Sequence, residues 1–414
     1  MFYVLPYQAS LNAMCVRLLT PYQLLKAPFQ LPGHESVGTD MAGGRYVLDE
    51  IHAYEPHRLG MLLALFKRLT RQCGSRFLFM SATMPKVLSA AIAQALGGMS
   101  EITADSETVV RFRRHRLHVR RDDLLSAEIE ASVRRDVVSG KSVLVVATTV
   151  GRAQELRKRL SDLNPHVLHG KFCGRDRFKK ERVIGRYAGR NLKPSERRAV
   201  LLIATQVVEV SLDLDFDVLY SDPAPLEALI QRFGRVNRGM RFPDLPVNVC
   251  AVVPDGCPVY PKSMIDGWLE SLTNLDSQVL DDRMLQDKLD RIYNGSVADW
   301  WCSEVSKAMA SFERDVLGSW RAFASNEDIR ELFDRMFDGD EVLPESLETE
   351  YRRLIEERPF EAPSLMVPVS LGQLHMLLRQ KRLEKRKIAG HAVAVAGVPY
   401  DDANGLQLRN HESV

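Results

Sequence analysis

Short apolar runs rich in Val, Ile, Leu and Phe recur along the chain as far as Val253. Amphipathic stretches separate them, such as His57–Thr70, which carries Leu and Met at helical spacing, and the stretch that begins at Thr149. Continuous apolar strands that alternate with helices are typical of parallel sheets covered on both faces. The pattern therefore predicts α/β architecture, with strands at Tyr46–Leu48, Phe77–Met80, Val143–Val146, Val200–Ile203, Val218–Tyr220 and Val249–Val253.

The domain organisation follows from two changes of character. The arginine-rich stretch Thr103–Asp123 separates two α/β sets, and its core RFRRHRLHVRR is either the solvated face of a strand or a DNA contact. After Pro254 the pattern becomes largely helical and contains all four tryptophans. We predict a first α/β domain over 1–110, a second over 111–254, and a mainly helical linker and accessory region over 255–414.

Composition narrows the class of protein without naming a partner. A chain of 414 residues with 45% hydrophobic and 27% charged residues and a net charge of +2 predicts an ordinary globular protein with more than one core. The six cysteines form no C-x-x-C pair, and no apolar run reaches membrane-spanning length. We expect reduced thiols, a cytoplasmic location and no membrane partner. The apolar run Phe2–Leu5 directly after Met1 suggests that the first domain is truncated.

Candidate chemistry begins at the stretch YVLDEIHAYEP, where Asp49 and Glu50 follow an apolar strand. Ligands of open α/β sheets bind at the carboxyl ends of strands. An Asp there can hold Mg²⁺ and an adjacent Glu can deprotonate the water that attacks a terminal phosphate. The alternative is a helix N-terminus, which also favours acidic residues. Downstream, FLFMSATMP places Ser81 and Thr83 after the next strand, either as nucleotide-sensing hydroxyls or as a helix cap.

A second cluster lies in the second α/β set. The strand in LLIATQVVEVSLDLDFD is followed by PLEALIQRFGRVNRG, which supplies Gln231, Arg232, Arg235 and Arg238. Arginines at every third residue of a helix can reach a polyphosphate and stabilise the charge on a transferred phosphoryl group. A solvated basic helix would not explain Gln231 or Gly234 among them.

No phosphate loop precedes the acidic pair. A Walker A loop has the pattern G-x-x-x-x-G-K-[ST] after a strand, so that backbone N–H groups cradle the phosphates. The nearest match, RRDVVSGKS, has Arg135 in place of the first glycine and precedes a strand, so Gly140–Ser142 predicts a turn between a helix and a strand.

Together these blocks resemble superfamily 2 helicases, with a DExH box, SAT, a threonine-bearing strand loop and Q-R-x-G-R-x-x-R. Within that superfamily, DEIHAYEP, LPYQASLNAM, LTPYQLLKAPF, LHGKFCGRDR and the segment from Val207 to Arg238 look most like CRISPR-associated type I helicase-nucleases, and VPYDDANGLQL is similar to the end of their accessory domain. The resemblance is detailed from Met1 to about Val253. It implies two RecA-like parallel-sheet domains, the first truncated, and a mainly helical C-terminal region.

The resemblance also implies roles for single residues. Asp49 and Glu50 would be the Mg²⁺-associated carboxylate and the general base, and His52 would couple this box to Gln231. Ser81 and Thr83 would link the ATP state to domain motion, with Asp213 near the nucleotide. Arg235 and Arg238 would contact phosphates, with Arg238 as the arginine finger. Residues in the blocks that contact the phosphates of a single strand are Asn12, Thr20, Thr149, His169 and Thr205.

The resemblance implies an ATP-dependent and Mg²⁺-dependent translocase on single-stranded DNA that acts with a CRISPR surveillance complex and its guide RNA in defence against foreign DNA. No histidine is followed by Asp, so we expect no nuclease site here. A separate polypeptide could supply the Walker A segment and the nuclease. Without it, we expect poor ATPase activity and an open sheet edge. Two alternatives stay open: a non-catalytic DNA-binding or docking fragment, and a superfamily 2 RNA helicase.

Overall fold

The computed structural model describes residues 20–209, 212–252, 269–321, 327–336 and 340–408. The chain forms two units that interleave along the sequence: unit 1 comprises Met1–Ala104 and Gln286–Asp338, and unit 2 comprises Asp105–Leu285 and Gly339–Val414. Each is described by itself below. The predicted division of the chain into structural domains over 1–110, 111–254 and 255–414 stays a prediction.

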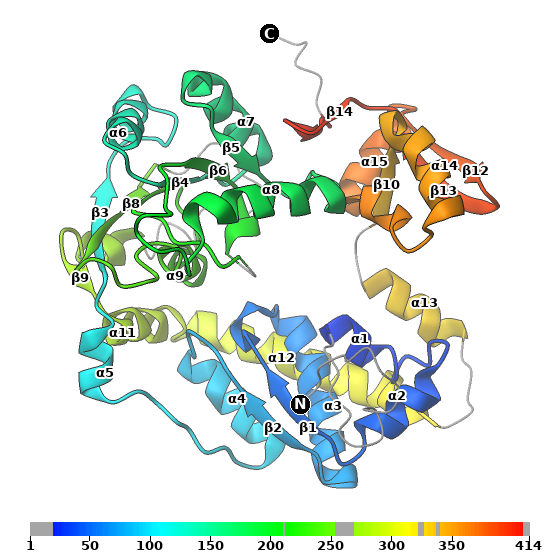
Figure 1. The fold of residues 1–414 in the computed structure, drawn as a ribbon. Coiled ribbons are helices and arrows are strands. Elements are labelled where there is room, and N and C mark those ends of the chain that lie inside the picture. The colour runs from blue at the N-terminus through cyan, green and yellow to red at the C-terminus, as the bar shows by residue number, and fades with distance from the viewer. Residues whose placement is uncertain (1–19, 210–211, 253–268, 322–326, 337–339, 409–414) are drawn as a thin grey trace. The chain divides into compact units, whose positions relative to one another are not determined.

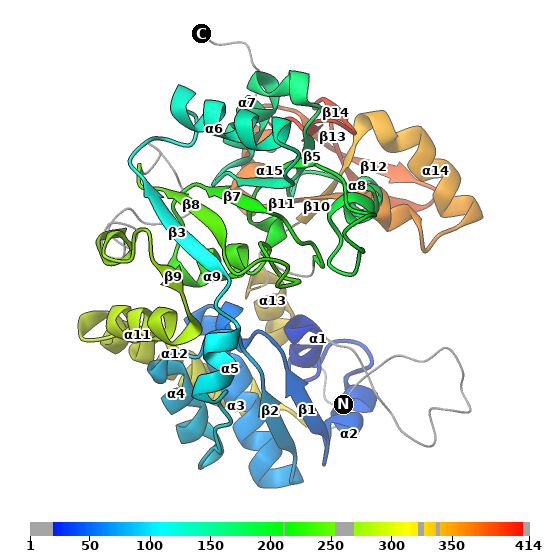
Figure 2. The same cartoon turned by 60° about the vertical axis from the view of Figure 1, so that its left-hand side comes forward.

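Unit 1 is built on two parallel strands, β1 (Arg45–Leu48) and β2 (Arg76–Phe79), paired in register from Arg45 with Arg76 to Leu48 with Phe79. The inward side chains of β1 alternate with exposed ones, and the helices pack on the inward face, as Figure 2 shows. Its other elements are α1 (Pro21–Leu25), α2 (His34–Met41), η2 (Ile51–Ala53), α3 (Pro56–Cys73), α4 (Lys86–Leu96), most of α11 (Asp282–Ile292), α12 (Ser296–Asp315), η5 (Leu317–Ser319) and α13 (Glu327–Met336).

The core of unit 1 lies between two helices that are far apart in the sequence. Pro at the first position starts α3, and Gly74 with φ +65° ends it in the left-handed conformation that glycine adopts without strain. Gly60 lets α12 approach closely, because a Cβ built there would lie 2.5 Å from the Val305 carbonyl oxygen. The predicted helix His57–Thr70 is thus confirmed, and α12 covers it.

Unit 2 contains a seven-stranded sheet in the order β5-β6-β4-β7-β8-β3-β9. All neighbouring pairs are parallel except β3 with β9. Helices α6 and α7 pack on one face, and Figure 1 shows α9 on the other. The strands are β3 (His115–Arg120), β4 (Val143–Val146), β5 (His166–Leu168), β6 (Leu201–Ala204), β7 (Val218–Ser221), β8 (Leu245–Cys250) and β9 (Val279–Leu280); the helices are α5 (Ser106–Arg111), α6 (Ala127–Val138), α7 (Val150–Arg159), α8 (Gly174–Ala188) and α9 (Leu226–Phe233), with short turns η3 (Ser161–Leu163) and η4 (Gln206–Val208).

The C-terminal part of unit 2 adds a four-stranded sheet, β11-β10-β13-β12, in which only β10 and β13 run parallel. Separate apolar clusters line its two faces, one with α15 and one with α14. This sheet was not predicted within the mainly helical region. Its elements are β10 (Asp340–Pro344), η6 (Glu345–Leu347), α14 (Glu348–Glu357), η7 (Ala362–Leu365), β11 (Val367–Val369), α15 (Leu371–Arg379), β12 (Leu383–Ile388) and β13 (His391–Ala396), followed by the hairpin β14 (Tyr400–Asp401) and β15 (Gly405–Leu406).

The predicted α/β class is confirmed, and the predicted strands correspond to β1, β2, β4, β6, β7 and β8. Strand β8 begins at Leu245, earlier than predicted, and it contains Pro246, a residue that is uncommon inside strands. Pro246 is in register with Arg116 of β3, while pairing with β7 begins only at Val247, so the missing N–H falls where one side is unpaired. The predicted turn at Gly140 is confirmed, with φ +86° between α6 and β4. No helix in the described part of the chain is long and apolar enough to cross a bilayer.

Candidate functional site

The acidic pair lies at the carboxyl end of β1. Asp49 is exposed, and one of its carboxylate oxygens accepts a hydrogen bond from the backbone N–H of Glu50 at 3.1 Å. Glu50 has φ +53° and ψ 43°, a left-handed conformation that is unusual for a residue with a side chain. Such strain persists only where the surroundings hold it and is concentrated at functional sites. The backbone turn aims the two adjacent carboxylates differently.

A chain of hydrogen bonds joins the acidic box to the SAT segment. His52 Nδ1 lies 2.5 Å from Ser81 Oγ, and that hydroxyl donates to the Thr83 carbonyl oxygen at 2.5 Å. Because a hydroxyl has one proton to donate, Ser81 must accept from His52, which assigns the proton of the ring to Nδ1. The same Nδ1 lies 3.4 Å from a carboxylate oxygen of Glu50. Ser81 is therefore the link between the two motifs, and Thr83 contributes its backbone.

Asp49 fits the partial Mg²⁺ site predicted for it. Mg²⁺ keeps several water ligands and is held by one or two carboxylates together with substrate phosphates. Asp49 is exposed and makes one short backbone contact through Oδ1. Among the described residues no group of three or more potential metal-ligating side chains occurs, so a resident metal site of protein ligands alone is not formed there.

Three of the predicted nucleic-acid contacts lie at one edge of the unit 2 sheet. Strands β4, β6 and β5 are adjacent and parallel, and Val146, Ala204 and Leu168 end them in register. Thr149, Thr205 and His169 follow these ends within three residues. Thr149 caps α7 by accepting from the N–H of Arg152 at 3.3 Å, and Thr205 is buried. The structure thus brings together residues that are 20 to 56 positions apart along the chain.

His169 is closed to a ligand in this arrangement. Its ring is fully buried, stacks on Phe172 and accepts the N–H of Lys171 at Nδ1. Burial lowers the pKa of His169 to about 4, so the ring is neutral. The hairpin β14–β15 covers it, since a Cβ on Gly405 would lie 2.9 Å from the ring. A contact from His169 to DNA stays a prediction that requires this hairpin to move.

The arginines after α9 bind the loop that follows β6. Arg235 is buried and donates to the carbonyl oxygens of Val208, Glu209 and Leu212 at 2.6–2.8 Å. It therefore fixes the backbone of the segment predicted to contact a nucleic-acid strand. A phosphate contact from Arg235 stays a prediction, because these carbonyls already engage all three guanidinium nitrogens.

Arg232, named above among the arginines that could reach a polyphosphate, forms a buried ion pair instead. It is 0% exposed, and its guanidinium donates to Glu209 at 2.9 Å and to Ser221 Oγ at 2.8 Å. Burial raises the pKa of Glu209, while the charge of Arg232 opposes that rise. The pair joins α9 to the loop after β6, so the motif that contains Arg232 and the loop that contains Thr205 are held together by one ion pair.

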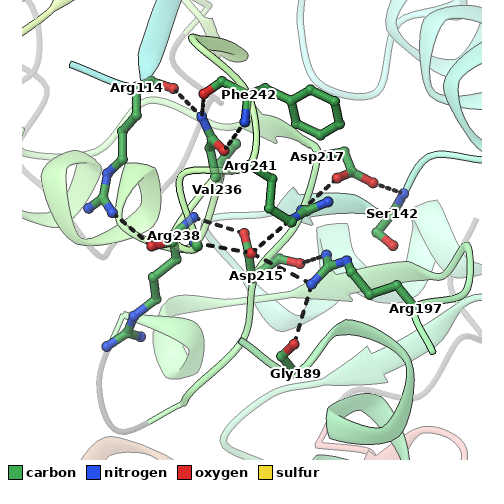
Figure 3. A network of polar contacts seen from close by, with 12 residues as sticks. Arg114, Ser142, Gly189, Arg197, Asp215, Asp217, Val236, Arg238, Arg241 and Phe242 are labelled. Carbon is green, nitrogen blue, oxygen red and sulfur yellow. Dashed lines mark hydrogen bonds and ion pairs between the residues drawn. The ribbon is translucent and has the colours of Figure 1, made fainter. Parts of the chain in front are cut away.

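Arg238 lies beside Asp213, and the nucleotide contacts expected of both residues stay predictions. The Arg238 guanidinium is 3.6 Å from the Asp213 carboxylate and 3.1 Å from the Leu212 carbonyl oxygen. Figure 3 shows what holds it: the buried carboxylate of Asp215 accepts from the backbone N–H of Arg238 at 2.8 Å and from Arg241 at 3.2 Å. Asp215 belongs to the motif LDLDFD, where apolar and acidic residues alternate. That pattern alone could not predict that the side chain of Asp215 is buried.

The remaining predicted residues are placed as follows. Asn12 lies outside the described residues. Thr20 caps α1 with a reciprocal capping box to Gln23, the structural alternative for such a residue. Gln231 lies on α9 and is half-buried. The expected coupling of Gln231 to His52 joins residues of different units and stays a prediction.

The described residues thus contain parallel sheets, an acidic box linked by hydrogen bonds to SAT, and two buried arginines, Arg232 and Arg235, that hold the loop after β6. A family model described as "CRISPR-associated nuclease/helicase Cas3, C-terminal" matches residues 139–241. A putative CRISPR-associated nuclease/helicase Cas3 of Methanocaldococcus jannaschii is 30% identical over 260 residues, which cover 60% of this chain and 34% of the relative. The CRISPR-associated endonuclease/helicase Cas3 of Thermus thermophilus is 31% identical over 251 residues, which cover 47% of this chain and 27% of the relative.

Solved structures agree at the level of the fold. The crystal structure of T. fusca Cas3 with AMPPNP matches with a TM-score of 0.63 at 18% identity, over 87% of this chain and 53% of that one. A "CRISPR RNA-guided surveillance complex, pre-nicking" matches with a TM-score of 0.59. The chain is thus similar to CRISPR-associated Cas3 nuclease/helicases, with residues 139–241 matching the C-terminal family model, and it spans about a third of the length of the curated relatives it matches.

Proposed function

We propose that this chain supplies the DExH–SAT and arginine-bearing parts of an ATP-dependent translocase that moves on single-stranded DNA. The observation that carries the proposal is the hydrogen-bond chain from His52 through Ser81 to Thr83. A box that only began a helix would not need a buried histidine bonded to the next strand end. In a motor, such a link passes a change at the attacked phosphate to the segment after β2.

The roles in hydrolysis follow from chemistry. Asp49 would hold Mg²⁺ through water, and Glu50 would orient and deprotonate the attacking water. Arg238 would neutralise charge on the transferred phosphoryl group, since arginine carries a permanent charge in a planar fork. Arg238 would leave its present partner Asp213 when it contacts the nucleotide. The backbone phosphates of the strand would meet the edge where Thr149 and Thr205 lie, which positions DNA without reading its sequence.

The phosphate cradle would come from outside the sequence printed above, which contains no G-x-x-x-x-G-K-[ST] segment. We propose that a further segment or a partner polypeptide carries it, and that a CRISPR surveillance complex with its guide RNA delivers the DNA. The proposed partner agrees with the description of one structural neighbour as such a complex.

The test is ATPase turnover of the purified chain with and without single-stranded DNA, beside a Glu50→Gln control. DNA-stimulated turnover that the control abolishes supports the proposal. If turnover is absent, a phosphate-loop polypeptide from a relative is added. Turnover that stays absent while DNA binding persists would overturn the proposal in favour of a non-catalytic DNA-binding fragment. Stimulation by RNA to the same extent as by DNA would favour an RNA helicase.

A further inference from the structure

Helix α8 has an unusual charge pattern. Its sequence, GRDRFKKERVIGRYA, contains six basic and two acidic residues. One face packs inward through Asp176, Ile184 and Ala188. The exposed face carries Phe178, Lys179, Arg182 and Arg186, which we call the α8 stripe. The stripe therefore presents three cations and an aromatic ring along about 12 Å of helix.

Many arginines on helices of unit 2 have a carboxylate one turn away, at 2.7–3.5 Å: Arg134 with Glu130, Arg159 with Glu155, Arg177 with Glu181, Arg352 with Glu348, and Arg353 with Glu357. Arg182 and Arg186 belong to a smaller group without one, together with the exposed Arg111, Arg135 and Arg379. Among the described residues neither Arg182 nor Arg186 has a carboxylate within ion-pair distance. They are instead one turn from each other, an arrangement that destabilises a helix by like-charge repulsion.

Phe178 adds an independent observation. Its side chain is 61% exposed, although burial of a phenylalanine is favourable and this helix has an apolar face that could take it. The guanidinium of Arg182 lies over the ring, 5.9 Å from its centroid. An exposed ring beside unpaired arginines is the combination that holds single-stranded nucleic acid, because bases stack on the ring while cations follow the phosphates.

The position of the helix agrees with this interpretation. α8 begins at Gly174, six residues after β5 ends at Leu168, so its start adjoins the sheet edge that carries Thr149 and Thr205. Phe178 lies in the second turn of α8, and the arginines follow it away from that edge. A strand that crossed the edge could continue along the stripe.

We propose that the α8 stripe is a second binding surface for single-stranded DNA, outside the motif residues. Arg182 and Arg186 contact backbone phosphates, and Phe178 stacks with an unpaired base. The inference rests on the proposed function in taking single-stranded DNA as the ligand, but it requires no ATP hydrolysis. A duplex would engage the arginines alone, since its bases are already stacked on one another.

The charge is tested with an Arg182→Ala/Arg186→Ala double variant and fluorescein-labelled oligothymidylate, by anisotropy at several salt concentrations. The matched control is Arg352→Ala/Arg353→Ala, which removes the same charge from α14 in the same unit. We expect a several-fold weaker affinity and a log–log salt slope lower by about 1.4, since each phosphate contact contributes about 0.7 for single strands. Equal effects of the two double variants, or no binding by the parent chain, would overturn the inference.

The ring is tested with Phe178→Ala against Phe360→Ala, because Phe360 is 99% exposed elsewhere in unit 2. We expect Phe178→Ala alone to weaken binding, by several-fold and without a change in salt slope. Full competition by polyglutamate with no effect of Phe178→Ala would assign the stripe to an acidic protein and overturn the proposal. If the chain shows no ATPase activity but binds DNA in a way that depends on the α8 stripe, only the proposed motor function is refuted.

Discussion

Replacement of Arg232 by methionine should destabilise unit 2 strongly. The guanidinium is 0% exposed and bonds to Glu209 at 2.9 Å, to Ser221 Oγ at 2.8 Å and to the Asp222 carbonyl oxygen at 3.2 Å. Methionine fills much of the volume but leaves the largely buried carboxylate of Glu209 without its direct cationic partner, with only the more distant charge of Arg235 nearby. Breaking a buried pair in this way costs about 3–5 kcal/mol, whereas the pair itself contributes little over apolar residues of similar size.

Two further variants make this reasoning quantitative. Arg232→Met/Glu209→Met removes both charges and should recover most of the loss, because no uncompensated charge remains. Arg134→Met makes the same chemical change at the half-exposed pair with Glu130 and should cost less than about 1 kcal/mol. The difference between the two single variants measures the effect of burial on an arginine–glutamate pair.

The pH dependence gives a separate check. Burial raises the pKa of Glu209 in the folded protein, and loss of Arg232 should raise it further. A raised folded pKa favours the protonated form, so the penalty is largest at neutral pH and shrinks as the pH falls toward the unfolded pKa. The cost of Arg232→Met, taken as the difference from the parent chain at each pH, should therefore decrease on acidification.

The measurement is hydrogen exchange by mass spectrometry on the full chain in increasing urea, read from peptides that cover β7 and α9, because it reports the opening free energy of that region alone. Arg232→Met no more costly than Arg134→Met would refute the idea that this pair is desolvated. A double variant as unstable as the single one would show that the lost energy comes from packing and not from an unpaired charge.

Three other predictions use single sites. Gly60→Ala should lower the free energy of unfolding of unit 1 by about 1–2 kcal/mol, seen as a lower urea midpoint in tryptophan fluorescence, because a Cβ would lie 2.5 Å from the Val305 carbonyl; an unchanged midpoint would contradict the close approach of α3 and α12. Gly405→Ala, at φ +69° and 2.5 Å from the Lys171 carbonyl, should cost about 1–3 kcal/mol and speed proteolysis at 400–408; unchanged cleavage would contradict it. Burial lowers the pKa of His115 to about 4, so its neutral ring contributes about 3 kcal/mol to the free energy of unfolding, and this contribution should be lost as the pH falls from 6.5 through 4. His115→Gln should therefore flatten the fall of that free energy between pH 6.5 and 4, measured by hydrogen exchange. An unchanged pH dependence would refute the assignment.

The local pattern of apolar residues predicted most helices and strands of the two α/β sets. It did not predict which distant segments pack against them. The apolar run of β4 and the helical spacing of α3 are properties of neighbouring residues, so they were visible in the sequence. The packing of α12 on α3 joins segments more than 220 residues apart, and the four-stranded C-terminal sheet pairs short strands of mixed polarity. Neither leaves a periodic signal.

The candidate site shows the same division. Asp49, Ser81 and Arg238 follow strands or a helix in motifs of defined spacing, and the structure places each at such an end. Asp215 was missed, and Arg232 was predicted as a phosphate contact and not as a buried ion-pair partner, because both are charged residues that become fully buried. Charged side chains are almost never buried without partners, and those partners, Glu209 and Arg241, are identified only by the tertiary fold.

The interleaving of the two units has a consequence for synthesis. Helix α3 is complete at Cys73, but its cover α12 begins at Ser296, beyond most of unit 2. At about 5–20 residues per second, a ribosome needs roughly 10–45 s to make that interval. For this time the face of α3 that packs on α12 has no native cover in the nascent chain, which is the condition that recruits chaperones. Since α12 is made so late, a message cut short within unit 2 would yield two unfinished domains and not one finished domain.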